Sequence, residues 1–251
     1  VGRVGDDAYG RTLREGLLAA GADVSRVRCI EGSTTGVALI VVEASGDNRI
    51  IVVPGANGLF SPEQLERDAE AFAGAKAALF QLETPIATVR RGLEVARAAG
   101  CITILDPAPA QALDDDLLSL VEYLTPNESE LAALSGAMFS ERAGIAEIEA
   151  AARSLLERGV TAVLSKLGAR GALLVDREGA TRVDAFEVRA VDTTAAGDCF
   201  NGAFAVALAR GDDARQAARF ACAAAALSTT KAGAQPSMPD GREVEALLAC
   251  R

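Results

Sequence analysis

The sequence predicts an α/β fold with a mostly parallel central sheet covered by helices on both faces. Short β-branched runs alternate with longer stretches rich in Ala, Leu, Glu and Arg, which is the rhythm of β-α-β units. Two glycine-bearing loops follow such runs, where ligands bind in sheets of this kind. With 251 residues, half of them apolar, the chain can bury a large core, and we predict a single domain over residues 1–251.

The first half of the chain combines a hairpin with β-α-β units. Residues 1–5 have the pattern of a strand end, and strands over 36–42 and 49–53, joined by a turn at 45–48, predict a hairpin. Ser61 caps and Pro62 begins a helix predicted over 62–73. A strand over 77–82, a helix over 86–99 that stops at Gly100, and a strand over 101–105 follow.

The second half continues this alternation and then becomes helical. The pattern predicts a strand over 123–125, a helix over 128–134 ending at Gly136, a helix over 145–158 ending at Gly159, and a strand over 160–165. A second hairpin is expected from strands over 171–176 and 181–184. From Ala196 onward, two long Ala-rich helices are separated at Gly211.

Composition excludes several classes of function. The formal charge of −10 argues against a nucleic-acid or anionic-membrane partner, and no apolar run approaches the roughly 18 residues of a membrane span. The five cysteines are odd in number and lack a C-x-x-C pair, so neither a disulfide framework nor a zinc site is indicated. The chain contains no histidine, which excludes Ser-His-Asp and His-metal chemistry. No secretory signal opens the sequence, so we expect a cytoplasmic protein.

The densest chemical signal is the segment from Asp192 to Gly202, DTTAAGDCFNG. Small residues lead into a helix whose first amides lack partners within it, and the helix dipole adds positive charge there. The segment therefore predicts a backbone anion site at 195–197, with Asp198 placed to accept a proton. An Asp in a first turn is also commonly only a cap, and a small-residue turn before a helix is common in such folds.

Two further segments follow predicted strands. The loop Lys166–Gly171 comes directly after the strand at 160–165, and together with the 195–197 turn it indicates a nucleotide site. Asn127 and Glu130 stand three residues apart, so one could contact a phosphate oxygen while the other holds Mg²⁺ through water. The same spacing suits a capping box, and that alternative stays open.

The motifs together resemble the phosphofructokinase-B-type carbohydrate kinases, and the ribokinases among them. Asp192–Asp198 resembles the second signature of that family, and Asn127–Glu130 its N-x-x-E motif. The resemblance runs in unbroken order from Val1 to about Leu248, through the segments TTGVA (34–38), PGAN (54–57), QLETP (81–85), DPAPA (106–110) and GAQPS (233–237).

This resemblance implies a three-layer αβα ribokinase-like fold with a small β lid formed by 36–53. It implies ATP-dependent phosphorylation of a sugar, D-ribose at O5, with Asp198 as general base and a homodimer formed through the lid. Glu83 would bind the sugar. The residues implied to bind ATP are Asn127, Lys166, Leu167, Gly168, Ala169, Arg170, Gly171, Ala195, Ala196, Gly197 and Cys222, the last beside the adenine. Glu130 would support Mg²⁺, and K⁺ would lie at Asp192, Thr194, Ser228, Lys231, Gly233 and Ser237.

The sequence also departs from the family pattern. Ala195 stands where a Gly is usual, Asp106 where Asn is usual, and Lys166 where Thr is common. The family's N-terminal segment, which contributes sugar contacts, has no counterpart here, and since no Met begins the chain we expect the natural start to lie upstream.

Two alternatives to a ribose kinase follow. The first is a related kinase for fructose, 2-deoxyribose, a nucleoside or 2-keto-3-deoxygluconate. The second is a non-catalytic nucleotide-binding remnant. A dinucleotide-dependent dehydrogenase is disfavoured because no G-x-G-x-x-G follows an early strand.

Overall fold

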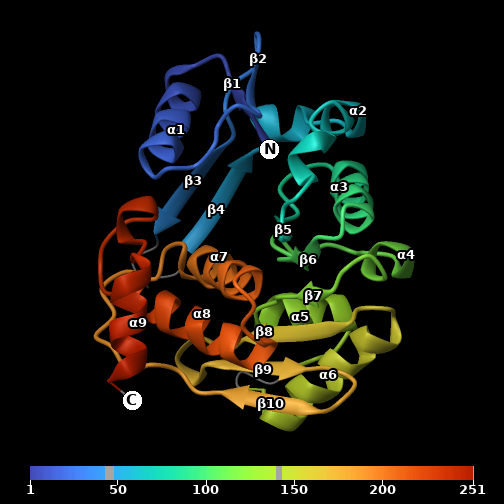
Figure 1. Cartoon of the computed structure of the whole chain (residues 1–251), viewed down its shortest axis with the longest axis vertical. Coiled ribbons are helices and arrows are strands. Elements are labelled where there is room, and N and C mark those ends of the chain that lie inside the picture. Colours follow the sequence, from blue (N-terminus) through green and yellow to red (C-terminus); the bar gives the residue numbers. More distant parts are fainter. Residues whose placement is uncertain (43–47, 140–142, 251) are drawn as a thin grey trace. The chain divides into compact units, whose positions relative to one another are not determined.

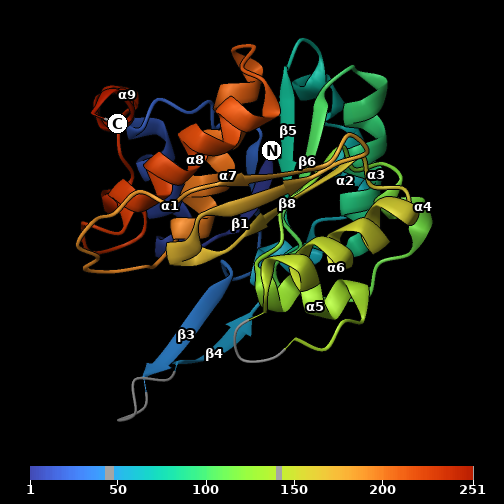
Figure 2. The ribbon, with the colours of Figure 1, turned by 90° about the horizontal axis from the view of Figure 1, so that it is seen from below.

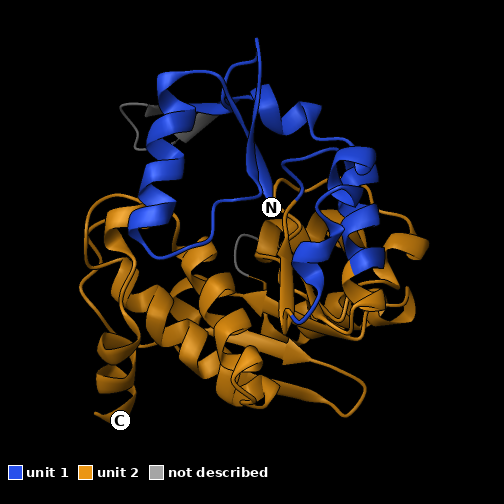
Figure 3. Ribbon diagram, turned by 45° about the horizontal axis from the view of Figure 1, so that its top comes forward, with its two compact units in different colours: residues 1–74, 82–95 blue, residues 75–81, 96–251 orange. Residues whose placement is uncertain are grey.

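The structure is a computed structural model that describes residues 1–42, 48–139 and 143–250. It divides into two compact units, which are described one at a time (Figure 3). Unit 1 comprises Val1–Gly74 and Leu82–Val95, and unit 2 comprises Ala75–Gln81 and Ala96–Arg251. The single-domain organisation stays a prediction.

Unit 2 is built on a sheet in which six strands of the described residues pair in the order β10-β9-β8-β7-β6-β5. The strands β5 to β8 are parallel, and β9 and β10 add an antiparallel hairpin at one edge. Their bounds are β5 (Ala77–Phe80), β6 (Ile102–Leu105), β7 (Tyr123–Leu124), β8 (Ala162–Lys166), β9 (Ala172–Val175) and β10 (Ala180–Val183). The mostly parallel sheet is confirmed.

Helices lie on both faces of this sheet (Figures 1 and 2). On one face α7 packs on β5 and α8 packs on β9 and β10, while α6 packs on β8 and β9 from the other face beside α5. The bounds are α4 (Asp115–Leu118), α5 (Glu128–Ser135), α6 (Ile145–Glu157), α7 (Ala196–Ala209), α8 (Ala214–Ser228) and α9 (Gly241–Ala249). No helix in the described part of the chain is long and apolar enough to cross a membrane.

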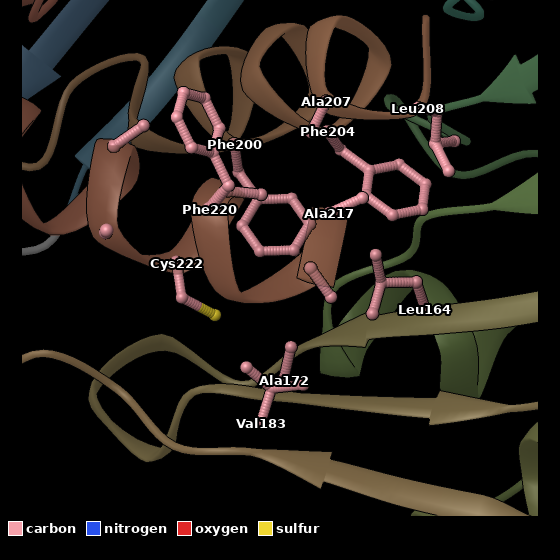
Figure 4. Close-up of a cluster of buried hydrophobic side chains, with 14 of the residues drawn as sticks. Leu164, Ala172, Val183, Phe200, Phe204, Ala207, Leu208, Ala217, Phe220 and Cys222 are labelled. Carbon is pink, nitrogen blue, oxygen red and sulfur yellow. The ribbon is translucent and has the colours of Figure 1, made fainter. Parts of the chain in front are cut away.

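The core of unit 2 fixes α7 against the sheet (Figure 4). Phe204 of α7 is fully buried and meets the ring of Tyr123 edge to face, with centroids 5.2 Å apart. Alanines along α7 and α8 let the two helices pack closely, and Leu164 and Ala172 close the layer from the strands. The start of α7 is thereby held at a defined place relative to the strand ends.

Unit 1 contains two small two-stranded sheets. The parallel pair is β1 (Gly2–Gly5) and β2 (Val27–Ile30), linked by α1 (Ala8–Ala19). The antiparallel pair is β3 (Val37–Val42) and β4 (Asn48–Val53), which confirms the predicted strand pairing, although 43–47 of the connecting turn lie outside the described residues. At its base Ala56 N–H donates to the carbonyl of Thr34 over 2.8 Å. Most of α3 (Ile86–Ala98) also belongs here.

The helix predicted over 62–73 is wrong in extent. Helix α2 covers only Pro62–Glu66, and a separate 3₁₀ turn covers Ala69–Phe72. The chain bends at Asp68, whose fully buried carboxylate lies 3.0 Å from the Arg3 guanidinium and 2.6 Å from that of Arg28. We attribute the break to this tertiary pairing, because a buried carboxylate must keep its partners. The elements α1, β2, α4 and α9 were not predicted.

Candidate active site

Helix α7 begins with an uncapped backbone end. Ala195 adopts left-handed angles (φ 58°, ψ 15°), the one non-glycine residue with positive φ in the described part of the chain. Among the described residues no side chain caps the helix, and the amides at its start have no carbonyl partner within the helix. The Ala196 N–H bonds to the Thr193 carbonyl over 3.2 Å, and the remaining first-turn N–H groups and the positive dipole end are what an anion site requires. Asp198 lies in the first turn with an exposed side chain.

Four neighbouring parallel strands each bring a polar side chain to their carboxyl edge, where α7 begins. Gln81 and Asp106 directly follow β5 and β6, Lys166 ends β8, and Asn127 follows β7 and bridges to Lys166. The backbone ladder continues into these residues, with Asp106 N–H bonded to Phe80 and Lys166 N–H to Pro126. Side chains from four segments far apart in the sequence therefore converge on one edge.

Gln81 contacts the predicted base directly. Its Nε2 donates a hydrogen bond to Oδ1 of Asp198 over 2.8 Å. An amide donor at this distance fixes the rotamer of the carboxylate while leaving Oδ2 for another proton donor.

A charged pair lies next to this contact. Lys166 Nζ is 2.8 Å from Oδ1 of Asp106, and Asn201 Nδ2 donates to the other oxygen over 2.6 Å. The Lys166 and Asp106 side chains are 13% and 4% exposed. Burial raises the pKa of Asp106, an effect that Lys166 opposes. Nζ also lies 3.7 Å from the position that a Cβ on Gly197 would take, so the ammonium sits beside the start of α7.

Asn127 and Glu130 form the capping box that the sequence left as an alternative. Asn127 Oδ1 accepts from Glu130 N–H over 2.8 Å, and Glu130 Oε2 accepts from Asn127 N–H over 2.7 Å. Burial raises the pKa of Glu130. A role for these residues at a phosphate or Mg²⁺ stays a prediction.

The loop from Lys166 to Gly171 is shaped by its glycines. Gly168 and Gly171 have φ of 56° and 87°, and Leu167 N–H bonds to the Gly171 carbonyl over 2.9 Å. A Cβ on Gly171 would stand 2.0 Å from the Val183 carbonyl oxygen, so only glycine fits there. Ala169 is exposed between them, and Arg170 is anchored on Glu128 over 2.5 Å.

The residues predicted to hold K⁺ lie on two loops tied together by Asp192. Its oxygens accept from Thr194 N–H (2.9 Å) and Gly233 N–H (2.8 Å), and these bonds lower its pKa to about 2. Ser228 and Ser237 are buried, each bonded to a carbonyl of its own turn, and Lys231 bonds to Glu243 over 2.9 Å. No group of three or more acidic or cysteine side chains that could hold a metal occurs among the described residues.

Two further predicted site residues make none of the contacts described above. Cys222 is buried in the Ala-rich core of α8, where burial raises its pKa to about 12. Glu83 is exposed and belongs to unit 1.

For three residues of the cluster the sequence analysis predicted no functional role. They are Gln81, Asp106 and Asn201. Gln81 and Asp106 open motifs that carried the family resemblance, and both are the first polar residue after a strand. That position was the available signal. Asn201 had none, because its place depends on how α7 faces the sheet.

Comparison with known proteins identifies the family. The model of the pfkB family carbohydrate kinases matches residues 1–241. This chain belongs to that family. It is 39% identical over 242 residues to a ribokinase of Haemophilus influenzae, covering 96% of this chain and 78% of the relative. It is 35% identical over 238 residues to a deoxyribokinase of Salmonella typhi, covering 94% and 77%.

A solved structure agrees with the fold of the pfkB family. Arabidopsis thaliana ribokinase, complexed with ribose and ATP, superposes with a TM-score of 0.91 at 35% identity, covering 99% of this chain and 80% of that one. The three-layer ribokinase-like fold is thereby confirmed.

Proposed function

We propose that this kinase transfers the γ-phosphoryl group of ATP to O5 of D-ribose, giving ribose 5-phosphate. The observation that carries the proposal is the pairing of an uncapped α7 start with an exposed Asp198 in its first turn. Similarity to a curated ribokinase and to a ribokinase bound to ribose and ATP supports the choice of substrates.

The predicted site residues divide the work of phosphoryl transfer. Asp198, oriented by Gln81, accepts the proton of the attacking hydroxyl. The amides at 195–197 stabilise the charge that develops on the transferring phosphoryl group. The loop 166–171 lies along the ATP phosphates and ribose, with Asn127 near the phosphates and Cys222 beside the adenine. Glu83 binds the sugar.

We propose two cation sites, one for Mg²⁺ at Glu130 and one for K⁺ at the loops joined by Asp192. Glu130 is an oxygen donor whose buried carboxylate fits Mg²⁺ held through water, and that ion neutralises phosphate charge when ATP is bound. The carboxylate of Asp192 ties the two loops together. With backbone oxygens as the other proposed donors, this set suits K⁺. Asp192, Thr194, Ser228, Lys231, Gly233 and Ser237 would hold it.

The hairpin supports the proposed dimer. Leu39, Ile51 and Val52 are 55%, 56% and 61% exposed. Apolar side chains exposed on a two-stranded sheet are expected where another surface covers them. We propose that 36–53 acts as lid and homodimer contact.

Ribose-dependent release of ADP tests the function. The chain is assayed with and without K⁺ over ribose, 2-deoxyribose, fructose, a nucleoside and 2-keto-3-deoxygluconate. Highest kcat/KM for ribose supports the proposal. A preference for 2-deoxyribose, the substrate suggested by the Salmonella relative, would assign a different sugar. ATP binding without turnover of any sugar, with or without K⁺, would leave the non-catalytic alternative.

A further inference from the structure

The side chains of Lys166, Asp106 and Asn201 are linked by hydrogen bonds, and the proposed function gives this linkage no role. We propose that the Lys166 ammonium binds the transferring phosphoryl group directly, and that Asp106 and Asn201 are positioning residues that hold it there. The inference rests on the proposed function, because it assigns a cation to the same phosphoryl-transfer site.

The Lys166 ammonium lies close to the start of α7. It is the last residue of β8, and its Nζ lies 3.7 Å from where a Cβ on Gly197 would stand. The ammonium is therefore adjacent to the backbone amides proposed to hold the transferring group. An ammonium has three donors, so it can bind Asp106 and a phosphate oxygen together.

The Lys166–Asp106 ion pair is buried, and burying it costs free energy. Taking a lysine and an aspartate out of water costs free energy that their mutual attraction repays only with good geometry. Here the geometry is enforced: Asp106 is 4% exposed and receives Lys166 over 2.8 Å and Asn201 over 2.6 Å. A buried pair at a strand end is weak evidence for stability, but it fixes a cation in one place.

Asn201 of α7 links the Lys166–Asp106 pair to that helix. Its side chain is buried, and its Oδ1 has no hydrogen-bond partner among the described residues. The bond from its Nδ2 to Asp106 satisfies the donor side of this buried amide. Asn201 thus joins α7 to the Asp106–Lys166 pair, and we propose that it helps to hold the ammonium beside the start of that helix.

The other two lysines of the chain provide contrast. Lys231 pairs with Glu243 over 2.9 Å, and Lys76 is exposed at the amino end of β5, opposite the edge where Lys166 ends β8. Lys76→Met is therefore a matched control for Lys166→Met. Asp116→Asn, at an exposed position in α4, is the control for Asp106→Asn.

The first test compares ATP with ADP, which lacks the transferring group, by calorimetric titration. Lys166→Met is expected to weaken ATP binding by about tenfold or more, the loss of one charged hydrogen bond, with a clearly smaller effect on ADP. Since this variant leaves Asp106 without its counter-ion, Asp106→Asn/Lys166→Met is measured in parallel with thermal melting. Equal weakening of ATP and ADP in the folded variants would overturn the proposal.

The second test asks whether Asp106 acts through Lys166. Asp106→Asn is expected to lower kcat by about tenfold with little change in the KM for ATP, and the double variant to match Lys166→Met alone. Additive losses of kcat would show a separate structural role and sink the positioning claim. If the wild type turns over no sugar, the proposed function fails, and the ATP-to-ADP comparison still decides the role of Lys166.

Discussion

The side-chain amide of Gln81 donates a 2.8 Å hydrogen bond to Oδ1 of Asp198, joining the residue after β5 to the first turn of α7. The contact couples the orientation of the proposed base to a strand end of the sheet rather than to a mobile loop. It also makes Gln81 a target for mutation that is separate from the base itself.

Replacing Gln81 should disturb turnover more than nucleotide binding. Gln81→Leu removes the donor, so Asp198 samples other rotamers, and we expect kcat to fall by about tenfold, the worth of one hydrogen bond to a charged group. Steady-state kinetics with varied ATP should show little change in KM for ATP. Loss of ATP affinity with unchanged kcat would contradict an orienting role.

Replacing the base should abolish most of the chemistry. Asp198→Asn keeps the shape of the side chain but cannot accept the proton, so turnover should fall by about 10²–10⁴-fold. Calorimetry should find ATP binding retained. A variant with near-normal turnover would remove Asp198 from the mechanism.

Ala195 should tolerate glycine and reject a β-branched residue. Its φ of 58° costs an L-residue roughly 1–2 kcal/mol, which glycine avoids at some cost in chain entropy. We expect Ala195→Gly to leave the free energy of unfolding unchanged or slightly raised in urea titrations. Ala195→Val should lower it, and a Val variant as stable as wild type would show that the turn adopts another conformation.

Asp192 should stabilise the fold in a pH-dependent way. Its pKa is lowered from the ordinary 3.8 to about 2, chiefly by the bonds from Gly233 and Thr194. A group with a lowered pKa contributes its full stabilisation above pH 3.8 and loses it as pH falls through about 2. The Tm of Asp192→Asn should therefore lie below that of wild type at neutral pH, with the gap closing toward pH 2. A gap independent of pH would refute this assignment.

The cysteines should separate into two reactivity groups. Cys29 and Cys250 are exposed, whereas Cys101, Cys199 and Cys222 are buried and have raised pKa values because of burial. Iodoacetamide at pH 8 should label the first two quickly and the other three only on unfolding, as followed by mass spectrometry of peptides. Rapid labelling of Cys222 in the folded protein would show that α8 opens.

The sequence predicted the parallel sheet and the start of α7 because both depend on local pattern. Short, mostly apolar runs form β5 to β8, and the small residues before Asp198 do form the uncapped turn. Asn127 and Glu130 were predicted with both a cap and a ligand role, and the structure shows the cap.

What the sequence could not provide depends on contacts between distant segments. The helix over 62–73 ended early because Asp68 pairs with Arg3 and Arg28, far away in the chain. Asp106 and Lys166 were noticed singly as departures from the family pattern, yet they are partners 60 residues apart. Helices α1 and α9 do carry start signals, which were overlooked: Asp7 caps α1, and Asp240 and Glu243 form a capping box at α9.

In each of the strands β5, β6 and β8, the polar residue lies at or just after the last paired position. The direction in which its side chain points therefore depends on the register of the strand. A slip of one residue in any of them would turn Gln81, Asp106 or Lys166 away from its partner and bury it among hydrocarbon. Deletions and insertions inside these strands should therefore be purged even when the protein still folds, while the helices between them can change length freely. Evolution of new substrates in this scaffold is expected to proceed through loops and to leave strand register untouched.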